Sequence, residues 1–190
     1  MITTLLIWLF TRLFFHSERK VVRVEEAQAY AEAHGLNRHL CLLVDYAIHS
    51  GRKRLFVWSF DEGRVVYTCP VAHGRGRDGS ACRRVRFSNE VDSWLSSEGK
   101  CRVGERYTGS FGTAYRLDGL ETCNSRMRER NIVLHGDRRV STRSVFPFRT
   151  RGSRGCVVVS RRSMARLDAL LAGQDGVLLY IFATPKNGQS

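Results

Sequence analysis

The sequence predicts a mainly β protein with a helical segment near the N-terminus and one helix late in the chain. The prediction rests on the spacing of apolar residues. Residues 24–50 place them at helical intervals, whereas from Arg54 onward short apolar runs alternate with polar turns. A second run of helical spacing follows Ser163. With 190 residues, 43% of them hydrophobic, the chain has room for one substantial core.

The first stretch, residues 1–20, is predicted to be a secretory signal or a membrane anchor. It opens with MITTLLIWLFTRLFF, which is apolar but shorter than the roughly 20 residues of a transmembrane helix. It lacks a basic start and a small-residue cleavage site. The charges that follow it, Arg19, Lys20 and Arg23, would favour a cytoplasmic body for an anchored segment. A buried N-terminal helix is the alternative.

Residues 21–53 are expected to form a helical segment without chemistry of its own. Glu25–Ala33 is rich in good helix formers, and Gly35 stands where that helix would end. Asn37 is expected to cap a second helix, whose apolar residues at helical spacing are Leu40, Leu43, Val44, Ala47 and Ile48.

Residues 54–185 are predicted to form a β-rich domain, followed by a polar tail over 186–190. The hairpin signal Asp61-Glu62-Gly63 separates two apolar runs, Leu55–Phe60 and Arg64–Tyr67. Ser163 is expected to cap the late helix. Further strands are expected at Val103–Tyr107, Ala114–Leu117, Ile132–Leu134, Val157–Val159 and Val177–Phe182.

A glycine-rich stretch, Val71–Gly79, matches the spacing of a dinucleotide-binding loop. No helical pattern opens after it, and Arg75 and Arg77 occupy its variable positions. We therefore interpret it as an ordinary loop and expect no cofactor.

The charge balance indicates an affinity for polyanions. The chain has 31 Lys and Arg against 18 Asp and Glu, a formal net charge of +13. Such a surface attracts nucleic acid, anionic head groups or an acidic cell wall. Because the excess arginines are scattered and form no compact tail, nucleic-acid binding is not expected.

The six cysteines show no C-x-x-C pair, so a structural zinc site has no support and no metal is expected. In an exported protein some of them would be able to pair, but spacing does not give the connectivity. If Cys156 is a free thiol, at least one more cysteine must also stay unpaired.

The stretch from Asn131 to Ser160 carries the candidate chemistry. An apolar run delivers His135, and a second run begins just after Cys156. If the two runs pair as strands, an imidazole and a thiol would meet, a common way to make a nucleophile. Arginines near Cys156 in the sequence are expected to lower its pKa: Arg149, Arg151, Arg154, Arg161 and Arg162.

Glycines beside these two residues have predicted roles as well. The backbone amides of Gly155 and Cys156 are candidate oxyanion donors, and Gly136 is expected to permit a turn after His135. No acidic residue is obviously placed to orient His135, so the carbonyl of Gly136 is the candidate. A buried cysteine beside an unrelated histidine explains the same residues equally well, and both interpretations stay open on residue identity alone.

The order of motifs distinguishes these interpretations. His135-Gly136 followed by Ser153-Arg154-Gly155-Cys156 resembles the signature of the murein L,D-transpeptidase catalytic domain family. The similarity covers roughly residues 54–182. Other segments that resemble this family are His73–Gly76, Phe87–Asn89, Ser96–Gly99, Gly104–Gly109, Leu117–Glu121 and Asn124.

The resemblance implies a β-sandwich-like catalytic domain and a two-step acyl transfer on peptidoglycan stem peptides in the cell envelope. Cys156 would be the nucleophile and His135 its base. Arg154 stands where many relatives carry histidine or an aromatic residue, and Val157 and Val158 replace a polar residue common after the cysteine. The substrate contacts implied are Ser153, Arg154, Tyr115 and His73.

Other functions remain open from the sequence. The same fold and thiol would serve an L,D-carboxypeptidase or endopeptidase, which differ only in the acyl acceptor. A non-catalytic module that binds cell wall or nucleic acid would keep the fold without the reaction. A papain-type protease is disfavoured by the order of histidine and cysteine and by the lack of an Asn or Asp partner signal.

Overall fold

A computed structural model describes residues 23–183 of the chain. The predicted leader over 1–20 and the polar tail over 186–190 lie outside the described residues. Within residues 23–183, no helix is long and apolar enough to cross a bilayer.

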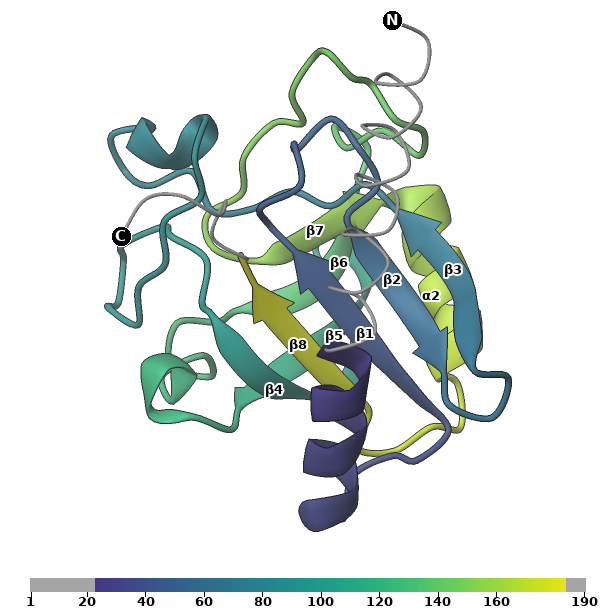
Figure 1. Ribbon diagram of the computed structural model, residues 1–190. Helices are drawn as coiled ribbons and strands as arrows, with labels where there is room; N and C mark the ends of the chain where they lie inside the picture. Colours follow the sequence, from purple (N-terminus) through teal and green to yellow (C-terminus); the bar gives the residue numbers. More distant parts are fainter. Residues whose placement is uncertain (1–22, 184–190) are drawn as a thin grey trace, which may run out of the picture.

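The described chain forms one sheet of eight strands (Figure 1). The order across the sheet is β3-β2-β1-β8-β4-β5-β6-β7, with parallel pairing only at β1/β8 and β6/β7. The strands are β1 Leu40–Asp45, β2 Leu55–Ser59, β3 Arg64–Cys69, β4 Gly99–Gly109, β5 Gly112–Gly119, β6 Val133–Asp137, β7 Val157–Ser160 and β8 Leu178–Phe182.

The sheet bends around one main apolar core, which we call the shared core. Side chains from all eight strands meet in this cluster, and α2 (Arg161–Leu171) adds Met164, Leu167 and Leu171 to it. The segment after β3 reaches the far edge strand, because Ala72 forms a bridge with Val158 of β7. The two edges of the sheet are therefore linked, and the prediction of a mainly β fold is confirmed.

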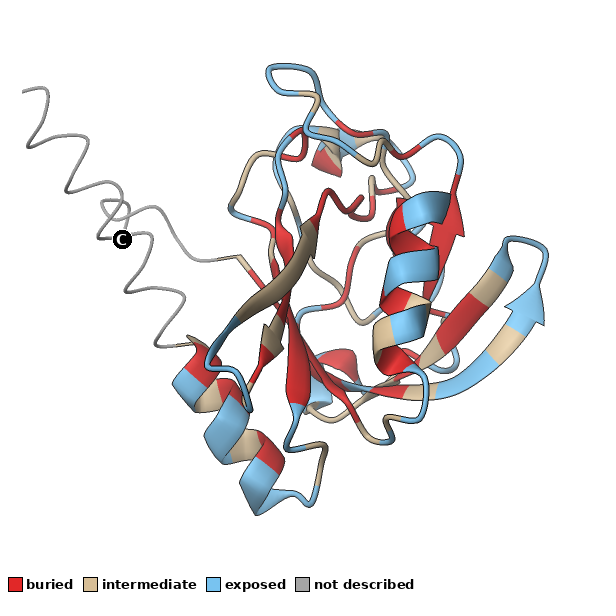
Figure 2. Cartoon of the chain, turned by 90° about the vertical axis from the view of Figure 1, so that its right-hand side faces the viewer, coloured by how far each residue is buried: buried red, intermediate tan, exposed pale blue. Residues whose placement is uncertain are grey.

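The first predicted helix is confirmed. Residues 23–33 are helical, and Gly35 follows with a φ of +62°, a conformation that favours glycine. Val24 and Ala27 of this helix pack on Leu43 and Tyr180, on the side of the sheet opposite the shared core. In Figure 2 the N-terminal helix and α2 each combine buried and exposed residues, as expected for helices that cover a sheet.

The second predicted helix, after Asn37, is wrong: those residues form strand β1. Leu40, Leu42 and Val44 face the shared core, whereas Cys41 and Leu43 face the N-terminal helix. Because both faces of β1 are buried, the strand is apolar throughout and lacks the alternation of a half-exposed strand. Residues 21–53 are thus not a separate helical segment, since β1 lies inside the sheet between β2 and β8.

The late helix is confirmed, but its cap is one turn earlier than predicted. Ser160 is the N-cap residue, and its Oγ accepts from the backbone N–H of Ser163 at 3.0 Å. Ser163 itself is buried in the first turn.

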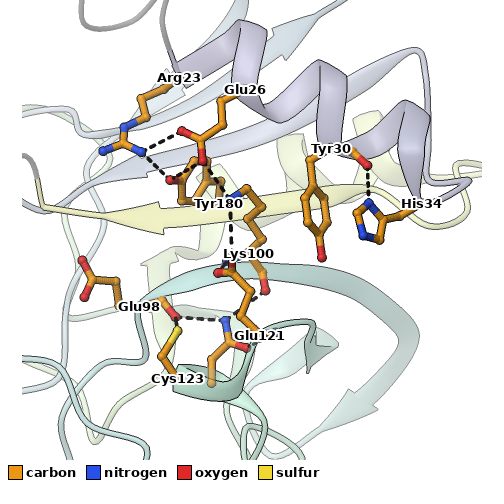
Figure 3. A network of polar contacts seen from close by, with 10 residues as sticks. Arg23, Glu26, Tyr30, His34, Glu98, Lys100, Glu121, Cys123 and Tyr180 are labelled. Atoms are coloured by element: carbon orange, nitrogen blue, oxygen red, sulfur yellow. Dashed lines mark hydrogen bonds and ion pairs between the residues drawn. The ribbon is translucent and has the colours of Figure 1, made fainter.

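A buried lysine ties the N-terminal helix to the sheet (Figure 3). Lys100 on β4 places its Nζ 2.8 Å from Oε1 of Glu26 and 3.3 Å from Oε1 of Glu121. The ammonium also lies over the ring of Tyr180, 4.5 Å from its centroid. Arg23 and Glu26 both bond the Tyr180 hydroxyl. One cation thus joins the helix, β8 and the segment after β5.

Replacing this lysine should destabilise the fold. Lys100→Met keeps the side-chain length but leaves Glu121 without its ion-pair partner among the described residues and Glu26 paired with Arg23 alone. We expect this change to lower the free energy of unfolding by about 1–3 kcal/mol, because both carboxylates are partly exposed. Arg64→Met is the matched control, because its ion pair with Glu62 is solvent-exposed and should contribute less than about 0.5 kcal/mol. Urea denaturation of both variants measures the difference. An equal fall in the free energy of unfolding in both variants would contradict the stabilising role of Lys100.

Candidate active site

Parallel pairing of β6 with β7 brings His135 and Cys156 together. The register aligns Leu134 with Val157 and His135 with Val158. Leu134 and Val157 face the shared core, so His135 and Val158 face the other way. Cys156 is two residues before Val158 and packs with it on that same side. His135 and Cys156 also line one cavity of about 600 Å³. His135 lies within β6, which continues to Asp137, whereas the sequence predicted a strand over Ile132–Leu134 with His135 at its end.

His135 is held as a neutral base. The side chain is 5% exposed, and its Nδ1 lies 3.2 Å from the carbonyl oxygen of Gly136. A carbonyl only accepts, so Nδ1 carries the proton and Nε2 has a free lone pair. Burial lowers the pKa of His135 below its ordinary value, and the hydrogen bond to Gly136 offsets only part of that effect. The imidazole is therefore neutral at pH 7 and can accept a proton at Nε2.

The thiol of Cys156 is protonated at rest, contrary to expectation. Burial raises its pKa, and hydrogen bonding by the backbone of Val133 and the charge of Arg130 offset only part of the increase. The arginines near Cys156 in the sequence are not the cations that act on it. The thiol donates to the carbonyl of Asn131 at 3.6 Å. A protonated thiol needs a base to become a nucleophile, and His135 is the imidazole that shares its cavity.

Arg130 is a residue that the sequence analysis missed. Its guanidinium donates to the carbonyl of Leu95 at 2.7 Å and to the hydroxyls of Ser93 and Ser97 at 3.1 and 2.8 Å. Arg130 therefore holds residues 93–97 against the segment that precedes β6 and brings a positive charge near Cys156. Nothing in the local sequence distinguishes it from its neighbours Arg126 and Arg128.

Ser153 shapes the loop that presents the nucleophile. Its hydroxyl donates to the carbonyl of Cys156 at 2.8 Å and accepts from the backbone N–H of Gly155 at 3.1 Å. The amide of Gly155 is therefore occupied and does not serve as the expected oxyanion donor in this arrangement. The amide of Cys156 remains the candidate. Gly155 has a φ of +113°, and a side chain there would meet Ile132 and the carbonyl of Leu95.

Gly136 forms no turn, which corrects the role expected for it. It lies inside β6, and an added Cβ would approach Cβ of Met164 to 3.0 Å and Cα of Arg161 to 3.1 Å. Glycine is needed here because α2 begins directly against the strand. Its carbonyl nevertheless orients His135, as expected.

The structure does not bring the side chain of His73 to the cavity. His73 is 2% exposed; its Nδ1 accepts from Arg54 at 2.7 Å and its Nε2 donates to the carbonyl of Ala81 at 2.7 Å. Burial and the charge of Arg54 lower the pKa of His73 to about 4. Its backbone carbonyl does accept from the N–H of Ser153 at 2.8 Å. His73 therefore supports the loop before Cys156 through its backbone, and its side chain does not line the cavity.

Tyr115 also lies elsewhere. Its ring belongs to the shared core, and its hydroxyl donates to Oδ1 of Asp168 on α2 at 2.8 Å. Its Cα pairs with Leu134, which faces the core, so the side chain lies on the side of β6 opposite His135. Tyr115 therefore does not belong to the candidate site.

The sequence did not predict two cavity residues beside His135, which are Asp137 and Phe111. Asp137 follows His135 by two positions, so strand alternation puts it on the same face. Hydrogen bonds from Arg139 lower the pKa of Asp137 to about 2, and these two side chains form an ion pair at 2.6 Å. Phe111, at the tip of the β4–β5 hairpin, stacks on the imidazole with ring centroids 4.3 Å apart. Phe111 thus covers one face of the base.

Arginine dominates the rest of the cavity wall. Arg154 lines it as expected, together with Arg75, Arg139 and Arg151. Asp137 is the acidic residue among the lining side chains, and it is already paired with Arg139. Within residues 23–183 no group of three or more His, Cys, Asp or Glu side chains is placed to hold a metal ion. The cavity is therefore suited to an anionic ligand beside a thiol and a base.

Comparison with known proteins gives one match to a family. A sequence model of the L,D-transpeptidase catalytic domain matches residues 16–182. No curated protein matches the chain.

Solved structures of similar fold share little sequence with the chain. The helical cell shape determining protein Pgp2 of Campylobacter jejuni aligns with a TM-score of 0.50 and 10% identity, over 78% of this chain and 49% of that one. Bd1075 of Bdellovibrio bacteriovorus aligns with a TM-score of 0.45 and 21% identity, over 78% and 49%. An L,D-transpeptidase of Xylanimonas cellulosilytica gives 0.44 and 16%, over 76% and 60%.

The chain thus aligns with only about half of the Pgp2 and Bd1075 chains. At these identities the likeness to Pgp2 concerns the fold alone.

The buried state of His73 predicts a pH dependence of stability. Its pKa is about 4 in the folded protein and about 6.5 in the unfolded chain, so below pH 6.5 only the unfolded chain takes up the proton. The free energy of unfolding should fall by up to about 3 kcal/mol between pH 7 and pH 4 on this account. His73→Gln can still accept from Arg54 and donate to Ala81 but cannot titrate, so its loss over this range should be smaller.

Denaturant titration at several pH values measures this effect. His39→Gln is the control, because the ion pair of this histidine with Asp61 is solvent-exposed and contributes at most about 1 kcal/mol, so the variant should alter the pH dependence far less than His73→Gln. An equally steep loss in His73→Gln would show that His73 is not the group responsible.

Proposed function

The chain belongs to the L,D-transpeptidase catalytic domain family, and we propose that it is a cell-wall enzyme that forms an acyl-enzyme at Cys156. The substrate is a peptidoglycan tetrapeptide stem, cut at the L,D bond after its third residue. The observation that carries this proposal is the shared face of β6 and β7, where a neutral imidazole and a protonated thiol line one cavity.

The first half-reaction forms a thioester. Nε2 of His135 takes the proton of the Cys156 thiol, and the thiolate attacks the carbonyl carbon of the third stem residue. A carbon–sulfur bond forms, and the carbonyl oxygen takes up negative charge next to the amide of Cys156. When the carbon–nitrogen bond breaks, the imidazolium returns its proton to the departing amine, and D-alanine leaves.

The second half-reaction releases the acyl group. The side-chain amine of another stem attacks the thioester, His135 takes a proton from that amine, and the thiolate of Cys156 leaves and is reprotonated. The product is a crosslink between two stems. If water is the acceptor, the product is a shortened stem, as for a carboxypeptidase. The positive cavity favours the anionic stem in both cases.

The roles of the supporting residues follow from their contacts. Gly136 fixes the tautomer that leaves Nε2 free, and Ser153 fixes the backbone on both sides of Gly155. Phe111 shields one face of the imidazole from water. This proposal places the enzyme outside the cytoplasm, where its substrate is, and of the two predicted roles of the N-terminal segment it requires the secretory signal.

Incubation with tetrapeptide stems tests the proposal. Intact-protein mass spectrometry should show an adduct equal to the stem without its D-alanine, mapped to Cys156, and stem analysis should show either crosslinked dimers or tripeptides. Cys156→Ala should give no adduct and no turnover. His135→Gln should slow adduct formation about 10²- to 10⁴-fold, the usual contribution of a general base.

His39→Gln provides the control, because this histidine is exposed and lies outside the cavity lining. It should acylate at the unaltered rate. Turnover that survives in Cys156→Ala, or an adduct on another cysteine, would contradict the proposal. Binding of stems by the unaltered protein without any turnover would instead favour a non-catalytic cell-wall module.

A further inference from the structure

We propose that Arg75 and Arg154, held on the ring of Trp94, form a binding site for a carboxylate of the stem peptide beside Cys156. This inference rests on the proposed function and names what selects its substrate. The proposed site is a pair of guanidiniums on one indole, at the wall of the cavity that holds the nucleophile.

Trp94 gathers positive charge at one place. The guanidinium of Arg154 lies 4.5 Å from the centroid of its ring, that of Arg75 at 5.3 Å and that of Arg77 at 5.7 Å. Like charges repel, so this arrangement needs the electron-rich ring to hold it. A guanidinium over a ring keeps the N–H groups at its edge available for hydrogen bonds.

Two of these three arginines have no acidic partner among the described residues. Arg77 forms an ion pair with Asp92 at 3.2 Å and donates to its carbonyl at 2.7 Å. Neither Arg75 nor Arg154 forms an ion pair within residues 23–183, and both line the cavity, which Arg77 does not. An anionic ligand in the cavity would supply the missing partner.

The backbone around Trp94 is built to hold the ring in position. Trp94 has a φ of +56°, an unfavourable conformation for a bulky side chain that persists only when its surroundings enforce it. The carbonyl of Trp94 accepts from Gly76 at 3.1 Å, and Arg130 donates to Ser93 and Leu95 on either side. An added Cβ at Gly74 would lie 2.5 Å from the Trp94 carbonyl, so the two loops are in close contact.

The same contacts tie this ring to the nucleophile. The N–H of Arg75 donates to the carbonyl of Ser153 at 3.0 Å, and Arg154 follows Ser153 directly. The carbonyl of Leu95 would lie 2.9 Å from an added Cβ at Gly155, the residue before Cys156. The two guanidiniums are thus fixed to the loop that presents the thiol, which suits a ligand group near the bond to be cut.

A carboxylate fits this pair because guanidinium forks match its two oxygens. A tetrapeptide stem offers carboxylates of two kinds: that of the terminal D-alanine, one residue beyond the L,D bond, and those carried by the preceding residues. The chemistry of recognition is the same, so the two sources must be separated by experiment.

The test compares stems that differ only in one carboxylate. The unaltered protein receives the free stem, a stem with the terminal carboxylate amidated, and a stem with the preceding carboxylates amidated, and kcat/KM for Cys156 acylation is measured. Amidation of the recognised group should lower kcat/KM about 10- to 100-fold, mainly through KM. The amidated stem that shows the lower kcat/KM identifies which carboxylate the two arginines bind.

Substitution of the arginines completes the test. Arg75→Gln and Arg154→Gln should each lower kcat/KM for the free stem about 10-fold or more, with little further loss on amidated stems. Arg154→Lys keeps the charge but not the fork and should recover only part of the activity. Arg77→Gln removes a positive charge from the same ring but outside the cavity. Its kcat/KM for the free stem should stay within about 3-fold of the value for the unaltered protein. Alkylation of Cys156 by iodoacetamide at an unaltered rate verifies that each variant keeps its fold and nucleophile.

Two results would overturn this inference while leaving the proposed function intact. One is equal acylation by free and amidated stems. The other is a loss of kcat/KM in Arg77→Gln as large as in Arg154→Gln. That result would show that the summed positive charge attracts the stem and that no carboxylate binds at Arg75 and Arg154. Failure of the unaltered protein to acylate with any stem would overturn the proposed function, and this inference with it.

Discussion

Hydrogen bonding of β6 to β7, in parallel and in a single register, fixes where His135 lies relative to Cys156. A shift by one residue would turn either side chain into the core, because strand side chains alternate between faces. Leu134, Val157 and Val159 anchor the register by their burial in the shared core. Gly136 lets α2 pack on the strand pair from the same side. The candidate site therefore depends on the packing of residues that take no part in its chemistry.

Burial sets the protonation states on the other face of this strand pair. It lowers the pKa of His135 and raises that of Cys156, so both groups are neutral at rest. Charge appears only when the proton moves between them. The thiolate and the imidazolium that then form face a cavity wall rich in arginine, which favours an anionic substrate. Phe111 covers one face of the imidazole and limits how much water reaches it there.

The sequence predicted the parts that follow from local pattern and motif order. The hairpin of β2 and β3, the late helix and the position of His135 and Cys156 at one cavity are of this kind. It mistook β1 for a helix because burial on both faces removes alternation. It misplaced Tyr115 and His73 because proximity to a motif does not say where a side chain points. Trp94 and Arg130 depend on contacts between distant loops, which no local pattern records.

The tautomer and charge of His135 are the most direct test of this account. Long-range ¹H–¹⁵N NMR correlation spectra of the imidazole distinguish its two nitrogens and follow its titration. We predict a neutral ring at pH 7 with the proton on Nδ1, and a pKa below the ordinary value of 6.5. A proton on Nε2, or an imidazolium paired with a thiolate at pH 7, would contradict the role of His135 as the base that activates Cys156.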